Sequence, residues 1–124
     1  VQLLDALGEH GERRRQHLHI GFPNEKLESR IIAPRVPGID ARLLAQLVAF
    51  VQQLRSLDLK KLPSVSESID WAKVLVLLHA SVLEEQTVRD TLNVLLKFES
   101  DIDSARGHIA HLTQKALQAL AVQN

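Results

Sequence analysis

The sequence predicts an all-α protein, a small helical bundle of about four helices followed by a long C-terminal helix, with one short strand near the N-terminus. Three observations lead to this fold class. From residue 24 onward, apolar residues recur three and four positions apart. Residues that cap helices stand before several of these apolar runs. The 124 residues are 45% hydrophobic, mostly Leu, Val, Ile and Ala, with one Trp and no Tyr, which suits a single core between packed helices.

Residues 16–22 carry the pattern of the strand. Leu18, Ile20 and Phe22 alternate with other residues, which is the period of two that is typical of a β-strand. A lone strand cannot satisfy its own backbone hydrogen bonds, and we predict no second strand in this sequence. The chain also begins at Val1 rather than Met, inside an apolar stretch. We therefore expect it to be a piece of a longer protein.

The first two helices are predicted between residues 24 and 57. Asn24 is the expected N-cap of the first, and Pro34 with residues 37–38 ends it. Its apolar side consists of Leu27, Ile31 and Ile32. The second begins at Ile39 or Asp40 and has a wide apolar face formed by Leu43, Leu44, Leu47, Val48, Phe50, Val51 and Leu54.

A sharply started helix is predicted for residues 64–80. Pro63 disfavours the α conformation at the residue before it. Ser64 is the expected N-cap, and Glu67 follows at the spacing of a capping box. Apolar residues cover most of the circumference, so we expect this helix in the middle of the bundle with the others around it. They are Ile69, Trp71, Ala72, Val76 and either Leu75 or Leu77.

Two further helices complete the predicted fold. Ser81 and Glu84 repeat the capping-box spacing, and a fourth helix is expected from Glu84 to Phe98. Its apolar face consists of Val88, Leu92, Leu95, Leu96 and Phe98.

The last helix, residues 99–122, has a narrow apolar seam of about two residues in seven, as in a coiled coil. Gly107 weakens it by about 1 kcal/mol relative to Ala. This helix is expected either to pack on a partner or to lie along the bundle. The seam consists of Ile102, Ala105, Ile109, Leu112, Ala116, Ala119 and Leu120.

The charge balance argues against several classes of partner. Lys plus Arg and Asp plus Glu both number 15, so no net charge attracts nucleic acid or an anionic membrane. The absence of Cys excludes disulfides and Cys-based sites. No apolar run reaches the length of a transmembrane helix and no leader is visible, so we expect a cytoplasmic protein.

We predict no catalytic site in this chain. The phosphate-binding P-loop, the dinucleotide-binding glycine motif and the nucleophile elbow of hydrolases are all missing. We predict no metal site either. His17 and His19 are neighbours on the expected strand, as are His108 and His111 on the last helix, but no carboxylate completes either pair at a ligand spacing.

Arg13, Arg14 and Arg15 form a basic run just before the expected strand. One interpretation is a solvated run of charge. The other is an arginine finger that acts on a nucleotide of a neighbouring subunit, because a planar and always charged guanidinium stabilises phosphoryl charge.

A series of motifs resembles the C-terminal part of MoxR-type AAA+ ATPases. In chain order these are Arg-Arg before a strand, Gly-Phe-Pro at residues 21–23, a helix with Glu25 and Glu28, and Arg-Val-Pro-Gly at residues 35–38. The most specific is Pro-Ser-Val-Ser-Glu-Ser-Ile-Asp-Trp-Ala at residues 63–72, followed by Val-Arg-Asp-Thr-Leu at residues 88–92. The likeness covers residues 13–97 and is greatest to the branch that includes the carbon monoxide dehydrogenase maturation ATPase.

The resemblance implies a division of the chain and a set of functional residues. Residues 1–23 would be the end of an AAA+ core, residues 24–98 its helical lid domain, and residues 99–124 a C-terminal helix outside the family pattern. The family's finger arginine corresponds to Arg13 or Arg14, although two glycines upstream depart from the family's helix. Related ATPases often have a sensor arginine where this chain has residues 64–68, and no arginine is present here. If this helix start faces the nucleotide, it does so through backbone amides and the hydroxyls of Ser64 and Ser66; the other interpretation is the capping box alone, with Glu67 opposing a phosphate.

The implied function is that of a lid. ATP and Mg²⁺ would bind to the missing core of the parent ATPase, with no cofactor in this chain, and the lid would move as a rigid body. The implied partners are the AAA+ core, neighbouring subunits of a ring, and a von Willebrand A-type adaptor or a client, since such ATPases act like chaperones in metalloenzyme maturation. The alternative is a free-standing helical interaction module that dimerises or docks through the seam at residues 102–120.

Overall fold

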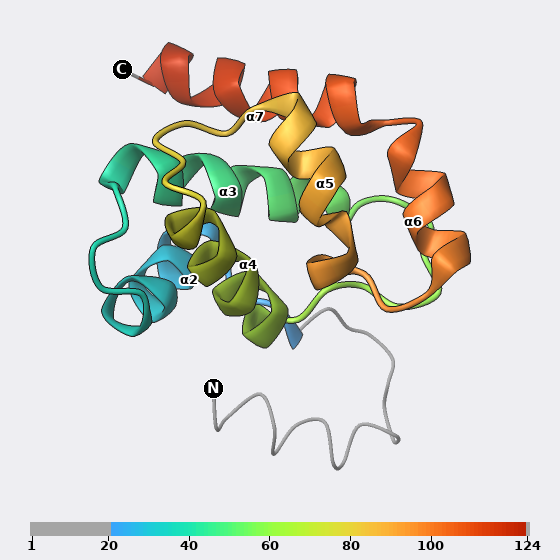
Figure 1. The fold of residues 1–124 in the computed structure, drawn as a ribbon, viewed down its shortest axis with the longest axis horizontal. Helices are drawn as coiled ribbons and strands as arrows, with labels where there is room; N and C mark the ends of the chain where they lie inside the picture. Colours follow the sequence, from blue (N-terminus) through green and yellow to red (C-terminus); the bar gives the residue numbers. More distant parts are fainter. Residues whose placement is uncertain (1–20, 124) are drawn as a thin grey trace.

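A computed structural model describes residues 21–123, and the side chains of residues 21–118 within that range (Figure 1). This part is all-helical, as predicted. In chain order its elements are α2 (Glu25–Ile32), the 3₁₀ helix η4 (Ala33–Arg35), α3 (Ala41–Leu54), α4 (Val65–Leu77), α5 (Glu85–Leu95), α6 (Glu99–Arg106) and α7 (Ile109–Gln123). The strand predicted for residues 16–22 lies almost wholly outside the described residues. Gly21 and Phe22, which are described, are not in a strand.

α3, and not α4, lies in the middle of the bundle. α7 runs along one side of α3, while α2 and α4 pack against the other (Figure 1). Most of the α3 surface is therefore covered, and its apolar residues Leu43, Leu47, Val51 and Leu54 are fully buried. α4 instead exposes one face to solvent along its whole length. The prediction that residues 64–80 form the centre is therefore wrong.

The start and the buried face of α4 agree with the sequence prediction. Ser64 and Glu67 form the predicted capping box, in which each side chain accepts a hydrogen bond from the backbone amide of the other. Trp71 is fully buried, with its ring 5.4 Å from that of Phe50 and its Nε1 donating to Thr91 Oγ1 at 2.7 Å. The sequence left open whether Leu75 or Leu77 belongs to the buried face. In the structure Leu75 is buried and Leu77 is exposed.

α2 faces the bundle differently from its prediction. Asn24 is the N-cap, as expected, and its Oδ1 accepts from the Leu27 amide at 2.8 Å. Leu27 is nevertheless 46% exposed, whereas Glu28 and Ile32 are fully buried. Residues four apart lie on the same helix face, so α2 turns a carboxylate toward the core beside Ile32. The apolar side predicted from Leu27, Ile31 and Ile32 is only partly correct.

α5 is shorter than predicted. It begins at Glu85, and its N-cap Glu84 makes no side-chain capping bond, so the capping box expected from Ser81 does not form. It ends at Leu95, and Phe98 is 45% exposed instead of joining the buried face.

The predicted last helix is two helices. Gly107 is the C-cap of α6, and α7 starts at Ile109. Glycine has a low helix propensity, which favours the end of a helix at this point. Four seam residues, Ala105, Ile109, Leu112 and Ala116, are buried in the core of this chain. Of the two expected arrangements, the structure shows the one in which the segment lies along the bundle.

The end of α4 is a Schellman motif with histidine at its left-handed position. His79 has a φ of 60°. Its amide donates to Val76 O at 2.9 Å, and the Ala80 amide donates to Leu75 O at 3.0 Å.

We predict that His79→Gly raises the free energy of unfolding by about 1 kcal/mol, because glycine adopts this conformation without the Cβ clash. Urea denaturation measures the change, and His79→Ala, which keeps the Cβ, is expected to give no gain. An equal effect of both substitutions would contradict the prediction.

Candidate functional site

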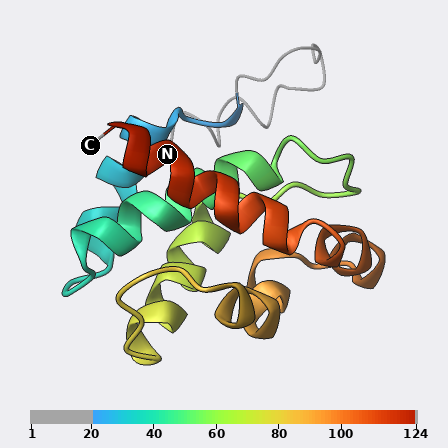
Figure 2. The same ribbon diagram turned by 90° about the horizontal axis from the view of Figure 1, so that it is seen from above.

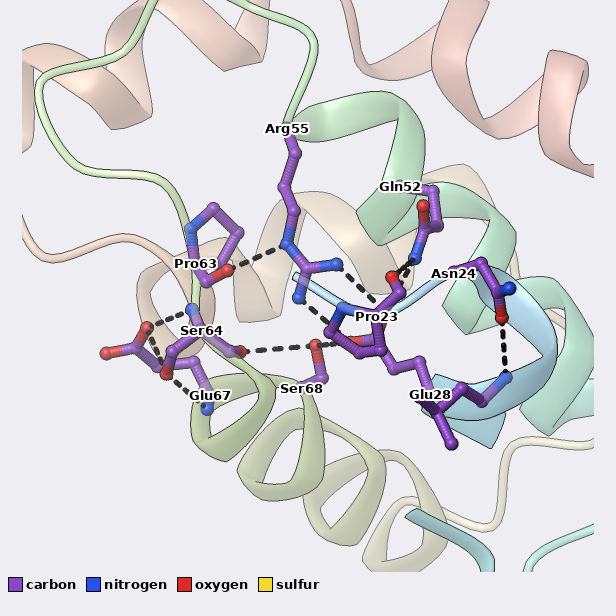
Figure 3. Close-up of polar contacts among 10 residues, drawn as sticks. Pro23, Asn24, Glu28, Gln52, Arg55, Pro63, Ser64, Glu67 and Ser68 are labelled. Carbon is purple, nitrogen blue, oxygen red and sulfur yellow. Dashed lines mark hydrogen bonds and ion pairs between the residues drawn. The ribbon is translucent and has the colours of Figure 1, made fainter. Parts of the chain in front are cut away.

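A buried polar network links the N-terminal end of the described chain to three helices (Figure 3). At its centre is an ion pair between Glu28 of α2 and Arg55, the C-cap of α3. The guanidinium binds the carboxylate in a bidentate manner, with Nη1 to Oε1 at 2.8 Å and Nη2 to Oε2 at 2.9 Å. The Arg55 side chain is only 6% exposed and the Glu28 side chain is not exposed at all, so solvent screens the attraction between them little.

Two neutral donors complete the coordination of the carboxylate. Gln52 Nε2 donates to Glu28 Oε1 at 2.9 Å, and Ser68 Oγ donates to Glu28 Oε2 at 2.9 Å. Glu28 thus accepts four hydrogen bonds, two of them from a cation. Such complete pairing is what makes a buried carboxylate tolerable, since an unpaired one carries a large desolvation cost.

Arg55 also contacts segments outside the helices. Its Nε donates to Pro63 O at 2.9 Å, and its guanidinium carbon lies 4.4 Å from the centroid of the Phe22 ring, a cation–π distance. Gln52 Nε2 reaches Pro23 O at 3.1 Å. We call Phe22, Pro23, Glu28, Gln52, Arg55, Pro63 and Ser68 the Glu28 network. It connects the entering chain, α2, α3, the α3–α4 loop and α4.

The Glu28 network is suited to holding segments together rather than to chemistry. A general base needs an oxygen within reach of a substrate proton. Both oxygens of Glu28 are instead occupied by protein donors, and the carboxylate has no exposure to solvent. Its guanidinium partner likewise directs donors on all three nitrogens at protein oxygens. The arrangement therefore fixes the positions of five segments relative to one another.

The predicted nucleotide-facing residues lie at the start of α4, next to this network. The Ser64 hydroxyl is engaged with Glu67, donating to Oε1 at 3.1 Å and accepting from the amide at 3.3 Å. Ser66 is exposed on the outer face of the helix. The Glu67 carboxylate thus accepts a hydrogen bond from the amide of the N-cap residue, and it places a negative charge at the helix end where an anion would otherwise be favoured. The nucleotide role of Ser64 and Ser66 stays a prediction, and Arg13 and Arg14 lie outside the described residues.

Glu67 is surrounded by groups that favour its charged form. Burial acts to raise its pKa, but hydrogen bonds from the Ser64 amide and hydroxyl outweigh it, together with Lys61 and Lys97, whose ammonium groups are 3.8 Å and 3.4 Å away. The pKa of Glu67 is therefore lowered in the folded protein.

This lowered pKa predicts a pH-dependent contribution to stability. Glu67 stabilises the fold above its unfolded pKa of about 4.3, and the contribution is lost as the pH falls through the lower folded pKa. Urea denaturation between pH 3 and 6 is expected to show that the wild type loses stability more steeply than Glu67→Gln in acid. Parallel curves for the two proteins would contradict this prediction.

A third buried carboxylate, after those of Glu28 and Glu67, holds the loop between α3 and α4. Asp101, in the first turn of α6, is buried and accepts from the Lys60 amide at 2.8 Å and from the Lys61 amide at 3.1 Å. The Lys60 ammonium lies 5.7 Å from the centroid of the exposed Phe98 ring. The two hydrogen bonds to Asp101 and the contact between Lys60 and Phe98 together connect the start of α6 to the loop that precedes α4.

Sequence reasoning identified Glu67 by its capping box but missed the other two buried carboxylates, Glu28 and Asp101. A signal was present for Glu28, which lies one turn before Ile32 and hence on the same helix face. Its partner Arg55 is 27 positions further along the chain, and no local rule connects the two. Asp101 and the amides it binds are 41 and 40 positions apart, which hides their pairing in the same way.

Comparison of this chain with protein-family models, with curated proteins and with solved structures found no match. Between residues 21 and 123, no three His, Asp or Glu side chains gather in a way that could hold a metal ion. Over the same residues, each helix is too short or too polar to cross a membrane.

Proposed function

We propose that this chain is the lid portion of a MoxR-type AAA+ ATPase, which converts nucleotide binding and hydrolysis in a separate core into movement of a helical bundle. The resemblance of residues 13–97 suggests this function. The Glu28 network is the structural observation that supports it best. A lid that moves as a rigid body needs its entering segment fastened to several helices, and this network fastens residues 22–23 to α2, α3 and α4.

The contacts indicate how movement would be passed on. A rotation of residues 22–23 relative to the bundle would break the bond between Pro23 O and Gln52 and uncover the Arg55 guanidinium beneath Phe22. Either change would leave a polar group without its present partner, the Pro23 carbonyl in one case and the Arg55 guanidinium in the other. Because such losses cost free energy, the entering segment and the bundle are expected to move together.

The rest of the proposal concerns groups outside this bundle. ATP and Mg²⁺ bind in the core, and Arg13 or Arg14 acts as the arginine finger toward a neighbouring subunit. The moving lid then acts on a von Willebrand A-type adaptor or directly on a client in metalloenzyme maturation. These roles follow from the resemblance alone.

The first test is the coding sequence upstream of Val1. It is expected to encode, in the same reading frame, a core with a P-loop of the form G-x-x-x-x-G-K-[ST]. A second test is calorimetry of the isolated chain with ATP and Mg²⁺, for which we expect no micromolar binding. Micromolar affinity in the isolated chain, or an unrelated upstream domain, would overturn the proposal.

A third test uses the longer protein. Arg55→Met is expected to reduce client maturation while leaving the affinity of the core for ATP unchanged, because all three guanidinium nitrogens of Arg55 already bond to protein oxygens. The matched control is Arg89→Met, which removes an arginine whose side chain is 35% exposed and is paired with Glu85 at 3.0 Å. Equal activity of both variants and the wild type would argue against a coupling role.

The alternative interaction module is less well supported by the packing. Ala105, Ile109, Leu112 and Ala116 already contact the rest of this chain, so that part of the seam is not open to a partner.

A further inference from the structure

The outer face of α4 is polar along most of its length but ends in two exposed leucines. Ser66, Asp70 and Lys73 are exposed on successive turns of this face, and Leu77 takes the next position in the series. Leu77 is 76% exposed and Leu78, beside it, is 55% exposed. Single exposed leucines are ordinary, but these two are adjacent and form a small apolar patch at the end of a polar face.

The two leucines are held in a fixed position. Leu77 is the last residue of α4 and Leu78 is its C-cap, and the Schellman bonds from His79 and Ala80 close the helix directly beyond them. In the view of Figure 2, the end of α4 and the loop that follows stand out from the rest of the bundle. A partner would therefore meet a preformed surface and would not have to order it.

A small cavity of about 210 Å³ adjoins these leucines. Its wall includes Leu78, His79, Ser81, Glu84 and Thr87, and it contains no lysine or arginine. The volume is below the roughly 300–1,000 Å³ of small-molecule sites, so it suits a single side chain. Glu84 supplies a carboxylate to the wall, whereas the hydroxyls of Ser81 and Thr87 and the imidazole of His79 can each donate or accept. With a carboxylate and no lysine or arginine, the wall favours a positively charged side chain over a negatively charged one.

Glu84 is the group that gives the cavity its charge. It is exposed, and within residues 21–118, whose side chains the structure describes, its carboxylate makes no hydrogen bond or ion pair with another side chain. It is therefore available to a cation from outside, and a guanidinium or ammonium group in the cavity would reach it.

We propose that Leu77, Leu78 and the adjoining cavity, together called the Leu77 surface, bind a short segment of a partner protein that has an apolar side chain close to a Lys or Arg. The apolar side chain covers the leucines, and the basic one enters the cavity toward Glu84. A stable dimer buries about 800 Å² on each partner. Two leucines and a cavity of one side chain's size fall well short of that area, so a peptide segment fits better than a second copy.

Selection of random heptapeptides displayed on phage against the immobilised full chain tests this proposal, which does not depend on the proposed lid function. Enriched sequences are expected to place Leu, Ile, Met or Phe within three positions of Lys or Arg. For a synthetic peptide of the enriched sequence, fluorescence polarisation is expected to show at least tenfold weaker binding to Leu77→Ser and at least threefold weaker binding to Glu84→Gln.

Matched control variants distinguish binding at the Leu77 surface from non-specific binding of the peptide. Leu27→Ser removes another exposed leucine, on α2, and Glu99→Gln neutralises another exposed glutamate, on α6. Both are expected to bind the peptide like the wild type. All four variants change exposed side chains, so their melting temperatures are expected to match that of the wild type, which checks that lost binding is not lost folding.

Three results would overturn the proposal. One is enrichment of no sequence or of acidic sequences. Another is unchanged peptide binding in Leu77→Ser and Glu84→Gln. The third is a concentration-dependent dimer in sedimentation equilibrium that Leu77→Ser abolishes, since a second copy would then be the occupant.

Discussion

Arg55→Met is expected to lower the free energy of unfolding by about 3–5 kcal/mol, the usual cost of removing one partner of a buried ion pair. Glu28 would keep only Gln52 and Ser68 as donors while remaining fully buried. Pro63 O would lose its donor as well. Urea denaturation followed by the fluorescence of the single tryptophan measures the change.

Two controls show whether the loss comes from the pair itself. Arg89→Met, at an exposed pair, is expected to cost at most about 1 kcal/mol. The double variant Glu28→Gln with Arg55→Met is expected to be less destabilised than the sum of its single variants, because it leaves no uncompensated charge. Additive losses would mean that the two groups do not interact energetically in the folded protein.

Trp71→Ala is expected to cost about 3–5 kcal/mol, as other truncations of large core aromatics do. The indole is fully buried and packs against Phe50. Its removal also leaves the Thr91 hydroxyl without the donor that it accepts from. Denaturation followed by circular dichroism measures the change, because the fluorescent residue is lost.

The control for this prediction separates volume from hydrogen bonding. Trp71→Phe keeps an aromatic ring beside Phe50 and removes the indole N–H, so a smaller loss is expected. Loss of one hydrogen bond accounts for about 1 kcal/mol of it. A melting temperature of Trp71→Ala close to that of the wild type would contradict the burial of this side chain.

The elements that could be predicted from the sequence are those set by local rules. The N-cap at Asn24, the capping box of Ser64 and Glu67 and the buried face of α3 each depend on residues within one or two helical turns. The all-α class followed from the same periodicity. These features need no knowledge of which helix packs on which.

The parts that could not be predicted depend on contacts between distant segments. Helical periodicity identified the apolar residues of α3 and α4 but did not show that α7 would cover α3. The interruption at Gly107 turned one expected helix into two. Glu28 became a core residue only because Arg55 reaches it from the end of another helix. The candidate site therefore emerged from tertiary structure.

The bond between Asp101 and the loop before α4 bears on where this protein can be trimmed. The ATPase lid proposed above would end near Lys97, so a chain cut at that residue is the obvious shorter version to make. Such a chain would leave the backbone amides of Lys60 and Lys61 without their acceptor, Asp101. It would also expose the side of α3 that α7 covers. The shortest segment that folds on its own is therefore expected to extend past Lys97 and to include α6 and α7.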